Sequence, residues 1–77
     1  MKISYDPEAD ALYIRLVEDK QECRTLRLNE EVALDVGHGE TLVGIEILDA
    51  SHLLGEGELP VVELINVRAA AGAALES

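Results

Sequence analysis

The sequence lacks the large aromatic side chains that usually fill a protein core. It has no Trp and no Phe, and Tyr5 and Tyr13 are its only aromatic residues. Leu, Ile and Val must therefore supply nearly all the apolar burial, at about 1.5 to 3 kcal/mol for each fully buried side chain. With 77 residues the chain is too short for two ordinary domains. A domain this small buries only roughly 60% of its unfolded surface, so we expect a thin core that gains stability by association.

Cysteines and long apolar runs are equally scarce. Cys23 is the only cysteine, which excludes an internal disulfide framework. No apolar run approaches the roughly 20 residues that a membrane-spanning helix needs, and no basic and apolar leader stands at the N-terminus. The sequence therefore predicts a cytoplasmic protein without a membrane partner.

Basic residues are the third shortage. Six Lys and Arg residues stand against 16 Asp and Glu residues, which gives a net charge of −10. Binding to nucleic acid depends on neutralising phosphates with Lys and Arg, so we expect no direct binding to DNA or RNA. The same charge favours encounter with a basic protein or a cation, although acidity also simply keeps a small protein soluble.

Alternating apolar and polar residues predict β-strands in the first part of the chain. Residues 2–5 and 12–17 are β-prone and flank a turn at residues 6–10, where a proline and an aspartate favour chain reversal. We expect these two segments to pair as a hairpin. A weaker strand is predicted over residues 23–28.

The clearest alternation lies in the middle of the chain. Residues 32–36 and 43–48 alternate on either side of the Gly-His-Gly-Glu turn at residues 37–40, which predicts a second hairpin. A helical turn is expected at residues 49–54, because aspartate and serine can cap its start and Gly55 can end it.

The end of the chain is less regular. Residues 61–67 are rich in β-branched residues and predict a strand, although one helical face also fits them. The alanine-rich tail at residues 69–77 is interpreted as a frayed helix or as disordered. Together these patterns predict one α+β domain over residues 1–68, mainly an antiparallel sheet. We expect a β-meander of four to five strands with one short helix after the fourth strand.

Two Asp-x-x-His pairs are the main candidates for a metal or small-ligand site. They are Asp35 with His38 and Asp49 with His52, and both follow the sequence Leu-Asp-x-x-His. A carboxylate can orient a nearby imidazole, and both groups bind zinc. The predicted topology places the two pairs at opposite ends of one strand, and zinc sites usually show closer ligand spacing. Solvent-exposed turn histidines are therefore the preferred interpretation.

No catalytic arrangement is visible. Asp6, Glu8 and Asp10 alternate like the start of a calcium loop, but the sixth position is Ala11 where such a loop needs glycine, so a turn is favoured. Cys23 lies next to acidic residues, which disfavour the reactive thiolate. We expect neither enzymatic activity nor a cofactor.

Two blocks of the sequence resemble a known family. Residues 5–14 read Tyr-Asp-Pro-Glu-Ala-Asp-Ala-Leu-Tyr-Ile, and residues 44–51 read Gly-Ile-Glu-Ile-Leu-Asp-Ala-Ser. In this order they resemble the small prokaryotic family called domain of unknown function 2283, over residues 1 to about 54. The resemblance implies a compact β-meander with a helical piece, no established catalytic activity and, in some members, a gene beside a small candidate toxin. It identifies no functional residues.

The preferred functional hypothesis is a protein–protein interaction module, antitoxin-like or regulatory, that binds a second copy of itself, a basic protein, or both. Its predicted interface residues are Tyr13, Leu42 and Leu48, which alternation places on the face opposite the main core. The alternative is a small-ligand or metal-binding accessory domain that uses the two Asp-x-x-His pairs. An enzyme would need a pocket that a domain this small builds only at a subunit interface.

Overall fold

A computed structural model describes residues 1–18 and 22–70 of the chain. Within this part, the elements follow one another in the order β1 (Lys2–Asp6), β2 (Ala11–Arg15), β3 (Arg24–Arg27), β4 (Val32–Val36), the 3-10 turn η1 (His38–Glu40), β5 (Leu42–Leu48) and α1 (Ala50–Leu54). All five strands belong to one antiparallel sheet. The predicted fold class, a mainly antiparallel sheet with one short helix, is confirmed.

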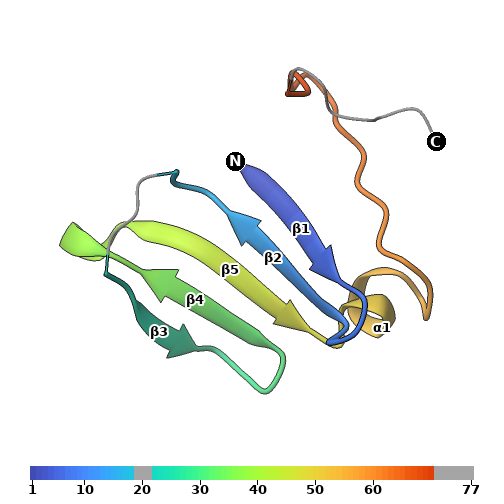
Figure 1. Cartoon of the computed structure of the whole chain (residues 1–77), viewed down its shortest axis with the longest axis horizontal. Helices are drawn as coiled ribbons and strands as arrows, with labels where there is room; N and C mark the ends of the chain where they lie inside the picture. The colour runs from blue at the N-terminus through green and yellow to red at the C-terminus, as the bar shows by residue number, and fades with distance from the viewer. Residues whose placement is uncertain (19–21, 71–77) are drawn as a thin grey trace.

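The sheet has the strand order β1-β2-β5-β4-β3 (Figure 1). Both predicted hairpins are present, β1 with β2 and β4 with β5, and the weakly patterned β3 pairs with β4. A simple meander would end with β5 at an edge, but here β5 lies in the centre and pairs with β2 as well. The helix α1 follows β5, which is the fifth strand once β3 is counted.

The pairing register separates the sheet into an apolar and a polar face. Residues directly opposite each other on neighbouring strands share a face. One row crosses all five strands on what we call the apolar face and consists of Ile3, Ile14, Ile45, Leu34 and Leu26. The neighbouring row on the polar face consists of Ser4, Tyr13, Glu46, Ala33 and Arg27. The alternation of apolar and polar residues in the sequence therefore corresponds to the two faces of the sheet.

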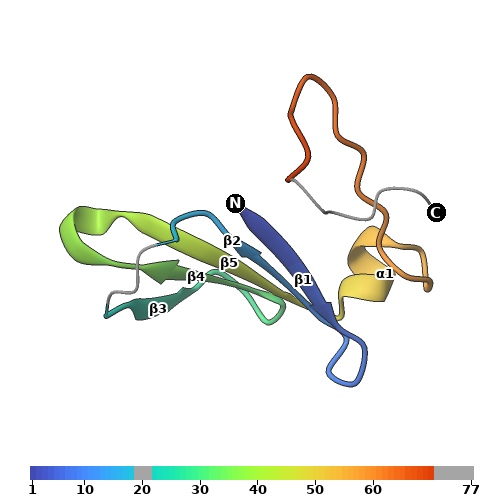
Figure 2. The ribbon, with the colours of Figure 1, turned by 45° about the horizontal axis from the view of Figure 1, so that its top comes forward.

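The core is thin, as the composition predicts. Among the described residues, the buried apolar side chains are Leu12, Ala33, Val36, Val43 and Ala50. Extensive contacts between elements of this described part occur only between neighbouring strands. Figure 2 shows α1 beyond one end of the sheet, next to β1, and not stacked on a face. The sheet thus forms a single layer.

Local chemistry explains the turns. The Asp6 carboxylate accepts backbone hydrogen bonds from Glu8 (3.0 Å) and Ala9 (3.4 Å), which closes the turn between β1 and β2. In η1, Gly39 has a φ of 64°, a conformation that glycine adopts without strain. The predicted boundaries of the helix are also correct, since Asp49 and Gly55 flank α1.

The strand predicted over residues 61–67 is wrong, because this segment forms no regular element in the described part of the chain. After α1 the chain turns at Gly57 (φ 89°) and leaves the sheet (Figure 2). No backbone–backbone hydrogen bond holds the described residues 59–70. β-branched residues favour a strand only where a neighbouring strand is present. The predicted tail lies, from residue 71 on, outside the described residues.

No helix in the described ranges, 1–18 and 22–70, is long and apolar enough to span a bilayer.

Candidate functional site

No element in the described part of the chain packs as a second layer on the apolar face of the sheet. Ile14, Leu34 and Ile45 in its central row are only half-buried. At the two ends of this row, Ile3 on β1 is 39% exposed and Leu26 on β3 is 44% exposed. A contiguous apolar patch that spans a whole sheet is typical of a surface that binds another protein.

The segment after α1 lies beside one edge of the apolar face. An open groove of about 570 Å³ separates it from β1, and its lining includes Met1, Ile3, Val62, Leu64 and Val67. Val62 is 52% exposed and Leu64 is 40% exposed, so the segment approaches β1 without sealing its own apolar side chains from water. Both sides of the groove therefore present apolar side chains to solvent.

Tyr13 on the polar face has a role inside the subunit. Its hydroxyl donates a hydrogen bond of 2.8 Å to Asp35, which also accepts one of 3.2 Å from Thr25. The ring passes over Gly44, where a Cβ atom would overlap the Tyr13 hydroxyl. Burial, followed by the hydrogen bond to Asp35, raises the pKa of Tyr13 to about 12. The side chain thus links β2, β5 and β4 on this face.

The other two predicted interface residues also belong to β5. Leu42 is 36% exposed and Leu48 is half-buried opposite Ala11. Alternation along β5 gives Leu48 the same face as Glu46, opposite Ile45, as expected. A partner contact of Tyr13, Leu42 and Leu48 stays a prediction.

A hydrogen-bonded corner joins the first turn to α1. The Asp10 carboxylate accepts hydrogen bonds from the Tyr5 hydroxyl (2.6 Å), the Ser51 amide (3.0 Å) and the Ser51 hydroxyl (2.8 Å). The Ala50 amide also donates to the Asp10 backbone oxygen at 3.0 Å. Asp49 precedes α1 but makes no capping bond, so Asp10 takes the place of the usual N-cap side chain.

This corner shifts the pKa values of its acid and its phenol. The hydrogen bond from Tyr5, and then that from Ser51, lowers the pKa of Asp10, since each stabilises the carboxylate. The hydrogen bond to Asp10 likewise raises the pKa of Tyr5. Both pKa shifts have the same cause: the ionised Asp10 carboxylate accepts hydrogen bonds from the neutral Tyr5 and Ser51 hydroxyls.

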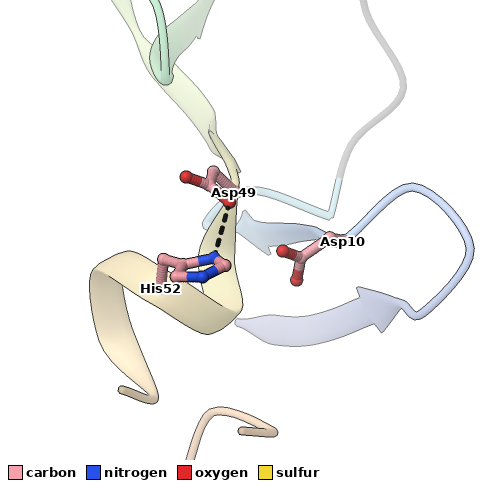
Figure 3. Close-up of side chains that lie close together, drawn as sticks. All are labelled: Asp10, Asp49 and His52. Atoms are coloured by element: carbon pink, nitrogen blue, oxygen red, sulfur yellow. Dashed lines mark hydrogen bonds and ion pairs between the residues drawn. The ribbon is translucent and has the colours of Figure 1, made fainter. Parts of the chain in front are cut away.

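Asp49 and His52 lie at the same corner (Figure 3). The His52 Nδ1 atom is 3.0 Å from an Asp49 carboxylate oxygen, and both side chains are exposed. Potential ligand atoms of Asp10, Asp49 and His52 lie within 4.8 Å of one another, the one such group among the described residues. The two oxygens of Asp10 already accept three hydrogen bonds, which leaves little of their acceptor capacity for a metal ion.

The two predicted Asp-x-x-His pairs do not come together within the subunit. His38 lies in η1 before β5, and His52 lies in α1 after it. The seven residues of β5 span about 24 Å at roughly 3.4 Å per residue. Asp35 is engaged with Tyr13 and Thr25 instead, so the repeated sequence marks two strand ends and not one site.

A comparison with known protein families assigns most of the chain to one of them. The family described as protein of unknown function (DUF2283) matches residues 2–51, which is more than half of the chain. The chain belongs to the DUF2283 family. The match contains every strand of the sheet and ends at Ser51, so it includes both the apolar face and the corner formed by Asp10.

The DUF2283 match stops before the apolar segment after α1, as the sequence resemblance also does. No curated protein and no solved structure matches the chain. The family assignment therefore covers the sheet and does not extend over residues 52–77.

Sequence reasoning missed the partnership of Tyr5, Asp10 and Ser51. It placed Asp10 in a turn and Ser51 at a helix start, both correctly. A carboxylate that ends a turn and a serine at a helix start are each signals of backbone capping. These local signals did not indicate that Ser51 would donate a hydrogen bond to Asp10, which lies 41 positions earlier in the sequence.

Proposed function

We propose that this DUF2283 protein is an interaction module that associates with a second copy of itself through the apolar face of its sheet. The observation that carries the proposal is the row of five apolar side chains across a single-layer sheet, partly exposed at both ends. A second sheet packed on this face would complete the second layer that small domains need around a core.

Electrostatics support self-association through this face. The chain carries a net charge of −10, so two copies repel each other wherever their charges meet. The central row of the apolar face carries no charged residue. It is therefore a surface on which two acidic chains can approach with little like-charge contact.

Sedimentation equilibrium on the full chain tests the proposal, and the expected result is a dimer. The change Ile3→Lys should weaken this dimer at least tenfold. A buried isoleucine contributes about 1.5 to 3 kcal/mol, and each 1.4 kcal/mol corresponds to about a factor of ten in Kd. Ile3 is 39% exposed in the subunit, so the subunit itself should tolerate the lysine.

The matched control is Ser4→Lys, which adds the same charge to the next residue of β1 but on the polar face. We expect it to leave the dimer unchanged. A monomeric wild-type chain, or equal weakening by both lysines, would contradict association through the apolar face.

An antitoxin-like or regulatory role toward a basic protein is a second candidate, and the distribution of charge favours it. Among the described residues, the strands carry four basic and three acidic residues, whereas the other positions carry one basic and 11 acidic ones. A basic partner would therefore bind the turns and loops and not the polar face. A basic protein encoded by an adjacent gene should then co-purify at about 0.1 M salt and dissociate near 1 M, where charges are screened. Absence of a complex at low salt would exclude that partner.

The metal-binding alternative is supported only by the cluster of Asp10, Asp49 and His52. Titration of the chain with Zn²⁺ in a calorimeter tests it, with His52→Ala as the comparison. The hydrogen bonds already made by Asp10 lead us to expect no heat that depends on His52.

A further inference from the structure

The segment formed by residues 59–67 carries apolar side chains that its own subunit does not cover. Val62 is 52% exposed and Leu64 is 40% exposed on one side of the segment, and Val61 and Ile65 on the other side are 89% and 67% exposed. Its backbone forms no backbone–backbone hydrogen bond within the described chain, although its β-branched composition favours a strand. Unpaired amides and carbonyls next to exposed apolar side chains are the features of a segment that pairs with another chain.

The sheet offers an unpaired edge that matches this segment. β3 is the last strand in the sheet order, so its outer edge has no neighbouring strand within the described residues. Leu26 (44% exposed) and Leu28 (59% exposed) point to one side of this edge, and Arg27 lies between them on the other side. An exposed edge strand is a template for strand addition.

The two sequences are complementary in pattern and in charge. Val62 and Leu64 flank Glu63 as Leu26 and Leu28 flank Arg27. If Glu63 is placed opposite Arg27, the flanking apolar residues face each other whether the strands run parallel or antiparallel. Cross-strand pairs of opposite charge and of apolar residues stabilise such pairing.

Arg27 is available for this pairing because its present contacts are weak. Its closest carboxylate is that of Glu46 at 3.9 Å, and its other hydrogen bonds, to backbone oxygens of Asn29 and Glu30, are 3.3 and 3.2 Å long. The Arg27 side chain is 49% exposed. Arg24, by contrast, is held by Glu40 at 2.6 Å.

We propose that residues 59–67 of one copy add as a strand to the β3 edge of a second copy, with Glu63 opposite Arg27. Within one subunit the segment lies at the β1 edge, across the sheet from β3, so the pairing uses another chain. Each copy has one such segment and one such edge, and a two-fold dimer satisfies both at once. This inference rests on the proposed self-association and specifies a contact that holds it together.

Charge exchange in the full-length chain, measured by sedimentation equilibrium, tests the pairing. Glu63→Arg alone and Arg27→Glu alone each place like charges opposite each other and should weaken the dimer at least tenfold. The double variant restores opposite charges and should return Kd to within about threefold of the wild-type value, since such pairs are non-additive. Far-UV circular dichroism of each variant checks that the sheet is retained.

The matched control is Glu58→Arg, which changes the net charge as Glu63→Arg does but lies outside the paired residues. It should leave the dimer as tight as, or tighter than, that of the wild-type chain. If the wild type is a dimer and the two glutamate variants behave alike, or the double variant is not rescued, the strand pairing is wrong while association through the apolar face stands. A monomeric wild type would overturn both.

Discussion

At the scale of single residues, Asp10 connects the two ends of the part of the fold that matches the DUF2283 family. It ends the first turn with a φ of 51° and holds Tyr5 on β1 and Ser51 on α1 through its carboxylate. An ionised acceptor with three neutral donors favours the folded state as long as the carboxyl group stays charged. The corner is therefore a pH-dependent contact within the subunit.

The change Asp10→Asn should lower the urea concentration at half-unfolding at pH 7. Because the pKa of Asp10 is lowered in the folded state, its contribution is complete above the unfolded value of about 3.9. It is lost as the pH falls through the folded pKa. The difference between wild type and variant should thus stay constant near neutrality and shrink below about pH 4. Glu8→Gln in the same turn is the control and should show neither effect.

Tyr13 over Gly44 gives a second prediction at this scale. The change Gly44→Ala should displace the ring and destabilise the sheet by about 1 to 3 kcal/mol, a typical cost of overpacking. The Tyr13 pKa, about 12 in the folded state, should fall toward the ordinary value near 10. Absorbance titration in a Tyr5→Phe background reports Tyr13 alone, and an unchanged pKa would show that the ring stays in place.

At the scale of elements, the strands follow their alternation closely, and the exceptions have physical causes. The β1–β2 and β4–β5 hairpins form as predicted because both the pattern and the turn residues are local. The central place of β5 was not predicted, since strand order depends on contacts between distant segments. Residues 61–67 have the composition of a strand, but no strand pairs with them within the part of the chain that the structure describes.

Hydrogen exchange should distinguish the paired strand β5 from the unpaired residues 61–67. β5 is paired on both sides, so its amides should exchange slowest at any protein concentration. The amides of residues 61–67 should exchange fast in dilute solution. They should become protected as the concentration is raised through the dimer Kd. Exchange of this segment that does not depend on concentration would argue against its pairing with a second chain.

The candidate site was only partly predictable from the sequence. The pairs Asp35 with His38 and Asp49 with His52 were identified from their spacing, but β5 separates them. Only Asp49 and His52 lie near a third potential ligand, Asp10, which comes from a different turn. Spacing along the chain shows which residues lie close together within one turn. It does not show which turns lie next to each other in the folded protein.

At the scale of the whole molecule, charge and apolar surface are separated. Among the described residues, the excess of acidic residues lies outside the strands, and a row of apolar residues lines one face of the sheet. The two kinds of partner proposed here would therefore use different surfaces. Salt should also strengthen binding to a second copy and weaken binding to a basic protein.

Raising NaCl from about 0.05 to 0.5 M should tighten the self-association, because salt screens the repulsion between two chains of charge −10. The few Glu–Arg attractions at a paired edge are smaller than this net repulsion. A complex with a basic protein should weaken over the same range. Sedimentation equilibrium at a series of salt concentrations measures the first effect, and a dimer that dissociates with salt would contradict an apolar interface.

The sequence by itself determined the two hairpins, their turns and the alternation of faces along the paired strands, although it also indicated a strand over residues 61–67 that does not form. These properties repeat every two residues or depend on a few neighbours, so short stretches of sequence contain them. Only the tertiary structure decided that β5 lies between β2 and β4, that Asp10 holds Ser51, and that no other described element covers the apolar face of the sheet. Those features depend on which distant segments meet, and this is settled by the packing of the whole chain.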